Sequence, residues 1–223
     1  MTAGVEVEVK LSVDRPDVVR ALIEQPQPGL LAGFEAASEP REVIVIDRYF
    51  DTASSALEGV LARARLRESR GRVELTFKRA GVETTGVTER QELEGPATQE
   101  LDIDAWPDSE ARRELVAIVG GEALVETARL RQRRLVRDLR RDDTTVELSL
   151  DQLEALDGER VVATRWELEA ELKAGRRDAL AELSNALQTL PGLSLAAESK
   201  RLFAMLAVAR ARGGDRSDGV TES

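Results

Sequence analysis

Along several segments of the chain, apolar and polar residues alternate one for one, and this two-residue period predicts β-strands. In residues 4–10 the alternation is between valines and the charged residues Glu6, Glu8 and Lys10. Because successive side chains of a strand point to opposite faces, the charged residues would share one face and the valines the other. This pattern, or a run of β-branched residues, predicts strands over residues 4–13, 41–49, 61–68, 72–79, 87–93, 130–139, 144–150 and 161–173.

Segments with helical spacing of apolar residues lie between the strands. They are residues 16–23, 54–58, 108–119, 178–190 and 199–210. Asp14 and Pro16 form a typical helix start, Gly120 ends the third helix, and Pro191 follows the fourth. Residues 69–71 and 141–143 predict hairpin turns. The sum is an α+β fold of about seven to nine strands, mostly joined by hairpins, in an antiparallel sheet or barrel.

The polar faces of these strands carry an unusual amount of charge of both signs. In a sheet with helices behind it, such faces would point to water. In a closed barrel they would lie inside, where charges are costly unless they are paired or bind ions. A barrel lined by both signs would therefore hold a polyanion together with a cation. The charges that share strand faces are Arg63, Arg65 and Arg67; Glu74 and Lys78; Arg131 and Arg133; Glu147 and Asp151; and Glu167, Glu169 and Glu171.

Composition limits the domain organisation and the chemistry. The 223 residues, 42% hydrophobic and 33% charged, fit one globular domain, which we place at residues 1–210, with a polar tail at 211–223 predicted to be disordered. Because there is no cysteine or histidine, thiolate and imidazole sites are excluded, and a metal ligand would be oxygen. Oxygen donors favour Mg²⁺ or Mn²⁺. Lysine is rare among the 32 cationic residues: the lysines are Lys10, Lys78, Lys173 and Lys200.

Net charge and hydropathy bear on partners and location. The net charge of −10 argues against a general nucleic-acid-binding surface, although a local basic pocket is compatible with it. We find neither a signal-peptide pattern nor an apolar run long enough to span a bilayer. The sequence therefore predicts a cytoplasmic protein that binds neither nucleic acid nor membrane.

An ordered set of short motifs resembles the CYTH superfamily, also called the triphosphate tunnel metalloenzymes. The resemblance runs through nearly the whole predicted domain. Three of the four lysines fall on its motif positions. The motifs are the ExExK sequence Glu6 to Lys10, Tyr49-Phe50-Asp51-Thr52, Arg65-Leu66-Arg67, Leu75 to Lys78, Glu92, Arg133, Asp151, Glu167-Leu168-Glu169 and Ser199-Lys200.

The resemblance implies an eight-stranded antiparallel β-barrel with surrounding helices, whose tunnel binds a triphosphate and a divalent metal. By position, it implies phosphate ligands at Lys10, Arg65, Arg67, Lys78, Arg133 and Lys200, and metal-side carboxylates at Glu6, Glu8, Glu92, Asp151, Glu167 and Glu169. Glu6, Glu8, Lys10, Lys78 and Lys200 are the implied catalytic set. A shift of register would put Arg131 or Arg134 in place of Arg133, Glu171 in place of Glu167, and Glu89 or Glu94 in place of Glu92.

The predicted activity is a divalent-metal-dependent triphosphatase, a hydrolase with inorganic triphosphate as the favoured substrate. Aromatic residues make up only 3% of the chain, so little is available to stack on a base or a thiazolium ring. The alternatives are adenylyl cyclase, thiamine triphosphatase and a non-catalytic polyphosphate-binding module. Cyclases of the superfamily often carry a His-Phe pair near the first strand, and this chain has no histidine. The expected partner is triphosphate or polyphosphate, and the expected state is a monomer or a homodimer.

Overall fold

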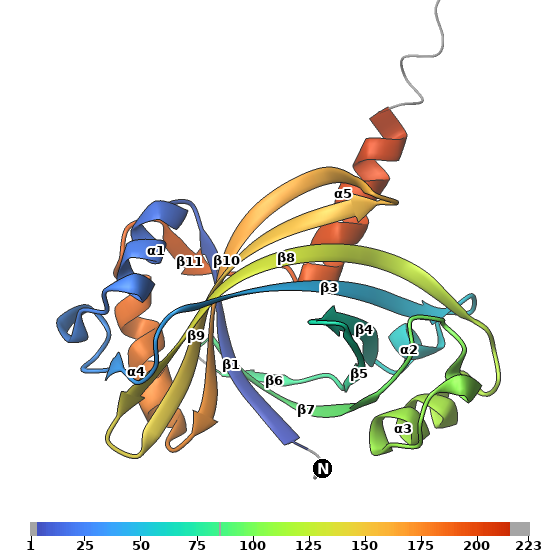
Figure 1. Ribbon diagram of the computed structural model, residues 1–223, viewed down its shortest axis with the longest axis horizontal. Coiled ribbons are helices and arrows are strands. Elements are labelled where there is room, and N and C mark those ends of the chain that lie inside the picture. Colours follow the sequence, from blue (N-terminus) through green and yellow to red (C-terminus); the bar gives the residue numbers. More distant parts are fainter. Residues whose placement is uncertain (1–3, 85, 215–223) are drawn as a thin grey trace, which may run out of the picture.

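The computed structural model describes residues 4–84 and 86–214, and its centre is a closed antiparallel barrel (Figure 1). Eight strands follow the order β1-β10-β9-β8-β3-β4-β5-β7, and pairing of β7 with β1 closes the ring. This confirms the predicted fold class. The barrel strands are β1 (Gly4–Val13), β3 (Arg41–Thr52), β4 (Arg63–Ser69), β5 (Arg72–Lys78), β7 (Val87–Pro96), β8 (Leu124–Arg141), β9 (Thr144–Asp157) and β10 (Arg160–Ala174).

Three short strands and several helices surround the barrel. Strands β2 (Glu35–Ala36), β6 (Val82–Thr84) and β11 (Leu193–Leu195) pair with β8, β7 and β1. Helices α1 (Pro16–Glu24) and α4 (Arg177–Gln188) cover one end, α2 (Ala56–Gly59) and α3 (Glu110–Val119) lie at the other, and α5 (Lys200–Gly214) lies against β8, β9 and β10 (Figure 1). Two 3₁₀ turns, η1 (Pro28–Leu30) and η2 (Ile103–Ala105), complete the fold.

The apolar faces of the strands point outward, toward the helices. In β1, Val7 and Val9 are buried in the largest apolar core, which also contains Leu22 of α1 and Leu183 of α4. Glu6 and Glu8, which alternate with these valines, line a cavity on the other face. The strands thus bury apolar side chains between barrel and helices and enclose charge inside the barrel. The prediction that the charged side of the first strand faces inward is confirmed.

Several element boundaries differ from the sequence prediction. Strand β9 continues to Asp157 because Leu153 and Ala155 are buried in a core shared with Ala204 of α5. Helix α5 continues to Gly214, so the first four residues of the predicted tail are helical, and the tail beyond them lies outside the described residues. Within the described part of the chain, no helix is long and apolar enough to cross a membrane.

Candidate active site

The barrel contains two cavities that share part of their lining. One, of about 420 Å³, is lined by eight glutamates and is called the carboxylate chamber. The other, of about 320 Å³, is lined by five arginines and is called the arginine chamber. Four residues line both chambers, so they mark the passage between them. These shared cations are Lys10, Arg65, Lys78 and Lys200.

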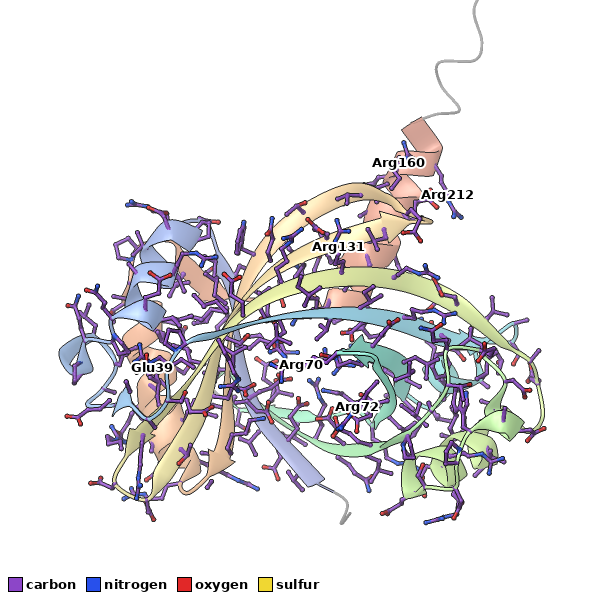
Figure 2. The ribbon with its side chains drawn as sticks, in the orientation of Figure 1. Glu39, Arg70, Arg72, Arg131, Arg160 and Arg212 are labelled. Atoms are coloured by element: carbon purple, nitrogen blue, oxygen red, sulfur yellow. The ribbon has the colours of Figure 1, made fainter. Side chains whose placement is uncertain are left out.

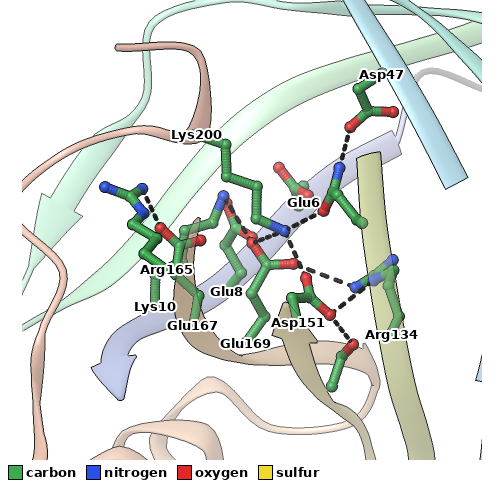
Figure 3. A network of polar contacts seen from close by, with 12 residues as sticks. Glu6, Glu8, Lys10, Asp47, Arg134, Asp151, Arg165, Glu167, Glu169 and Lys200 are labelled. Atoms are coloured by element: carbon green, nitrogen blue, oxygen red, sulfur yellow. Dashed lines mark hydrogen bonds and ion pairs between the residues drawn. The ribbon is translucent and has the colours of Figure 1, made fainter. Parts of the chain in front are cut away.

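Two of the shared cations, Lys10 and Lys200, meet at one carboxylate. The Nζ atoms of Lys10 and Lys200 lie 3.1 and 3.2 Å from Glu169 Oε1 (Figure 3). Lys10 also contacts Glu8 at 3.1 Å, and Lys200 contacts Asp151 at 2.5 Å. Burial disfavours both ammonium groups, but these carboxylates outweigh it and raise the pKa of both lysines. Both lysines therefore carry a positive charge that is fixed inside the barrel.

Lys78 lies in more cationic surroundings. Its Nζ is 2.9 Å from Glu6 Oε1 and 3.1 Å from Glu92 Oε1. Burial and the nearby Arg65 nevertheless lower the pKa of Lys78 below its ordinary value. An anion placed between Lys78 and Arg65 would relieve their repulsion, and a phosphate oxygen has the charge for that position.

Arg65 and Arg67 are fixed by Asp47, a residue that the sequence analysis did not identify. Asp47 is fully buried, and its carboxylate accepts hydrogen bonds from Arg65 Nη1 at 3.0 Å and from Arg67 Nε and Nη2 at 2.7 Å each. Gln132 also donates to it. Burial disfavours the charged carboxylate, but Arg65 and Arg67 hold the pKa of Asp47 well below its usual range. The sequence could have identified Asp47, because it lies two residues before Tyr49 of the motif and therefore shares a strand face with it.

A second residue that sequence reasoning missed, Arg90, connects Glu6 and Glu8. Arg90 Nε donates to Glu6 Oε2 at 2.7 Å, and Nη2 donates to Glu8 Oε1. Burial opposes ionisation of Glu6, but Lys78 and Arg90 hold its pKa far below the ordinary value. Arg90 lies two residues before Glu92 in β7, so the alternation that singled out Glu92 places Arg90 on the same face.

The structure corrects the predicted position of the β8 arginine. Arg133 is exposed and lines neither chamber, whereas Arg134 lines the carboxylate chamber and contacts Asp151 at 2.9 Å and Glu169 at 3.2 Å. The apolar side of β8 at Leu135 packs in the core beside α1, so the neighbouring even-numbered position faces the barrel interior. Arg134 is therefore the β8 arginine of the site.

Two predicted metal-side carboxylates line neither chamber. Asp151 is fully buried behind Lys200 and Arg134 and pairs with both. Glu167 is 1% exposed and accepts a hydrogen bond from Arg165, whose guanidinium lies 4.4 Å from the ring centre of Phe203 (Figure 3). These positions fit supporting roles. The predicted residues that do line a chamber are Glu6, Glu8, Lys10, Arg65, Arg67, Lys78, Glu92, Glu169 and Lys200.

The carboxylate chamber fits a hard divalent cation by its donor set, which contains carboxylate oxygens and neither imidazole nor thiolate. Burial raises the pKa of Glu92, and the adjacent Glu6 carboxylate raises it further against the opposing effect of Lys78. A cation between Glu6 and Glu92 would reduce that repulsion. In the described part of the chain, no group of three such side chains forms a preorganised metal site.

Comparisons with known proteins identify the family and the fold. A family model of the CYTH domain matches residues 4–202. HpAC1 from Hippeastrum, described as a proposed adenylyl cyclase with a dominant triphosphatase activity, aligns with a TM-score of 0.64 and 20% identity over 93% of this chain and 96% of that one. A proposed adenylate cyclase from Bacillus halodurans aligns with a TM-score of 0.54 and 19% identity, over 88% of this chain and 96% of that one. PH1819 from Pyrococcus horikoshii aligns with a TM-score of 0.54 and 18% identity, over 92% of this chain and 99% of that one. At these identities the structural likeness shows the fold.

Proposed function

The chain belongs to the CYTH domain family, and we propose that it is a divalent-metal-dependent triphosphatase whose substrate is inorganic triphosphate. The observation that carries the proposal is the arrangement of Lys10, Arg65, Lys78 and Lys200 between a glutamate-rich chamber and an arginine-rich one. A linear polyanion can pass between these cations while one end lies among the carboxylates. The dominant triphosphatase activity described for HpAC1, a protein of the same fold, supports this reaction.

The shared cations would hold the phosphates in the passage. Arg65 and Arg67 present planar guanidinium groups that can donate two parallel hydrogen bonds to a phosphate, and Asp47 fixes both. Lys10 and Lys200 act as compact charges at the other side of the passage. Because phosphoryl transfer needs charge neutralisation and in-line positioning more than covalent chemistry, these residues supply most of what the reaction requires.

The terminal phosphate would lie in the carboxylate chamber. There, Glu6, Glu8 and Glu92 would hold Mg²⁺ or Mn²⁺, which supplies charge neutralisation on the phosphate oxygens when bound. Water attacks the terminal phosphorus, the new P–O bond forms, and the bridging P–O bond breaks to give orthophosphate and diphosphate. The attacking water loses its proton to a carboxylate.

A substrate panel at fixed metal concentration tests this function. The purified chain is incubated with Mg²⁺ or Mn²⁺ and inorganic triphosphate, thiamine triphosphate or ATP, and released phosphate and cyclic AMP are measured. We expect the highest kcat/KM for phosphate release from inorganic triphosphate. Failure on triphosphate with efficient turnover of another compound would transfer the assignment to that compound. Tight binding without turnover under any metal would make the protein a polyphosphate-binding module.

A further inference from the structure

Thr76, in strand β5, has a buried hydroxyl group without a partner. Side chains alternate along β5, so Leu75 and Phe77 are fully buried in the core beside α3, whereas Thr76 and Lys78 line the arginine chamber. Thr76 is 1% exposed, and its Oγ1 atom has no hydrogen-bond partner within residues 4–84 and 86–214. The neighbouring residues of this motif have clear roles in packing or ion pairing, and the Thr76 hydroxyl does not.

The residue opposite Thr76 on the adjacent strand also has an unpartnered polar atom. Arg65 of β4 faces Thr76 in the antiparallel pairing of β4 with β5, which typically puts the two Cβ atoms about 5 Å apart on the same face. Arg65 uses Nη1 to contact Asp47 at 3.0 Å and the Tyr49 hydroxyl at 3.5 Å. Its Nε is buried and has no partner in the described part of the chain. Two unpartnered groups therefore lie side by side on the wall of the chamber.

This combination is specific to Arg65 and Thr76. A buried polar atom that lacks a hydrogen bond costs free energy, and most such atoms in native proteins are paired. Among the described residues, six side chains contain an atom of this kind, and only Arg65 and Thr76 of these six also line a chamber. The four that line neither chamber are Thr98, Thr127, Arg165 and Glu167.

Both groups can be satisfied by one acceptor that enters the chamber. The Nε–H group of arginine can only donate, and a threonine hydroxyl can donate to the same atom. The one carboxylate among the described lining residues is Glu58, which is 62% exposed and lies 3.5 Å from Arg201. Lys78, two residues from Thr76 on the same face, adds a further positive charge. An anionic oxygen would accept both hydrogen bonds and reduce the repulsion between Arg65 and Lys78.

We propose that Thr76 is a phosphate-binding residue, whose hydroxyl donates a hydrogen bond to the phosphate oxygen that also accepts from Arg65 Nε. The proposal rests on the proposed function for the identity of the anion, which is inorganic triphosphate. Thr76 contributes direction rather than charge. Because threonine is branched at Cβ, its χ1 angle is restricted in a strand, and the hydroxyl is held in place at little cost in entropy.

The test removes the hydroxyl and keeps the shape of the side chain. Inorganic triphosphate is titrated by calorimetry, in EDTA, into the wild type, Thr76→Val, Thr76→Ser and the matched control Thr127→Val. Thr127 lies in β8 and has an equally unpartnered Oγ1 within the described residues, but it lines neither chamber. We expect Thr76→Val to raise Kd by about tenfold, the effect of one hydrogen bond to a charged group. Thr76→Ser, which keeps the hydroxyl, and Thr127→Val should stay within about threefold of the wild type.

Stability should move in the opposite direction from affinity. In the free protein the Thr76 hydroxyl has no hydrogen bond to lose, and valine removes the cost of burying it unpaired. The urea midpoint of Thr76→Val should therefore equal or exceed that of the wild type. A purely structural role for Thr76 predicts a lower midpoint, with any loss of affinity accompanying it.

Three results would overturn the role of Thr76. Unchanged affinity in Thr76→Val would mean that water, rather than phosphate, satisfies the hydroxyl. Equal losses in Thr76→Val and Thr76→Ser, or a clearly lower midpoint in Thr76→Val, would show that the hydroxyl is not what the ligand needs. In the phosphate-release assay, the same rise should appear in KM. Weaker binding by Thr76→Val without phosphate release from the wild type would disprove the triphosphatase and leave the role of Thr76 intact. Phosphate release with a KM that Thr76→Val does not change would do the reverse.

Discussion

Replacement of Asp47 by asparagine removes one negative charge from the wall of the tunnel while keeping the size of the side chain. Asp47 is fully buried and accepts hydrogen bonds from Arg65 and Arg67, whose side chains are only 12% and 20% exposed. Removing one member of a buried ion pair typically costs about 3–5 kcal/mol, because the remaining charge is left without compensation. Asparagine keeps an acceptor oxygen, so we expect the free energy of unfolding to fall by about 3 kcal/mol at pH 7.

The pH dependence of this loss separates charge from shape. The pKa of Asp47 is depressed in the folded protein, below an ordinary value of 3.8. Its ionised form therefore contributes stability that is fully present well above pH 3.8 and is lost as the pH falls toward the folded pKa. As the pH falls, Asp47 is protonated in the unfolded chain before it is protonated in the folded protein. At about pH 3 the difference between wild type and Asp47→Asn should have shrunk by about 1 kcal/mol.

Urea unfolding of both proteins at about pH 7 and pH 3 measures the two differences. Asp157→Asn is the matched control, because its partner Arg212 of α5 (Figure 2) is 68% exposed, so loss of this pair should cost much less. An Asp47→Asn loss that is equal at the two pH values would refute the reasoning, since it would mean that the carboxylate charge makes no contribution. A loss as small as that of Asp157→Asn would also refute it. In the triphosphatase assay, the variant should raise KM by about tenfold because Arg65 and Arg67 lose their common anchor.

Three further predictions concern the site directly. Glu6→Gln and Lys78→Ala should remain folded, by circular dichroism, and lower kcat by at least about 100-fold; large stability losses with activity retained would contradict a role in the site. Arg134→Gln should raise KM for triphosphate by about tenfold, a loss expected for one charge-assisted contact, whereas Arg133→Gln should stay within about twofold of the wild type. A larger rise in KM for Arg133→Gln than for Arg134→Gln would mean that Arg133, as first predicted from the sequence, is the β8 arginine of the site. Removal of divalent metal with EDTA should abolish phosphate release, and Mg²⁺ or Mn²⁺ should restore it; release that persists in EDTA would exclude a metal-dependent mechanism.

Local sequence pattern predicted most of the strands and the composition of their polar faces. The alternation in residues 4–10 was sufficient to place Glu6, Glu8 and Lys10 on one face, and the structure puts that face inside the barrel. The register of β8 was not determined in the same way, because residues 129–134 contain four arginines at both odd and even positions. The outward packing of Leu135 in the core beside α1 is what identifies Arg134 as the inward residue.

The partners of each charge were also beyond local pattern. Asp47 and Arg67 are 20 residues apart, Arg90 and Glu6 are 84 apart, and Lys200 and Asp151 are 49 apart. Their spacing in the sequence therefore does not predict that they are partners. Sequence reasoning accordingly recognised Lys200 and missed Asp47 and Arg90.

The amino-acid sequence by itself determined which segments form strands, the charged residues that share one face of a strand, and the few positions at which lysine replaces arginine. These properties are local, because strand periodicity and residue chemistry do not depend on distant contacts. Only the tertiary structure decided that the sheet closes, that the charged faces meet inside, and that their cations divide the interior into a carboxylate chamber and an arginine chamber. Closure depends on the pairing of β1 with β7, whose partner residues are 78 to 88 positions apart in the sequence. Closure also decides what each charge does, because a charge that faces water and the same charge inside a buried tunnel differ in pKa, partner and function.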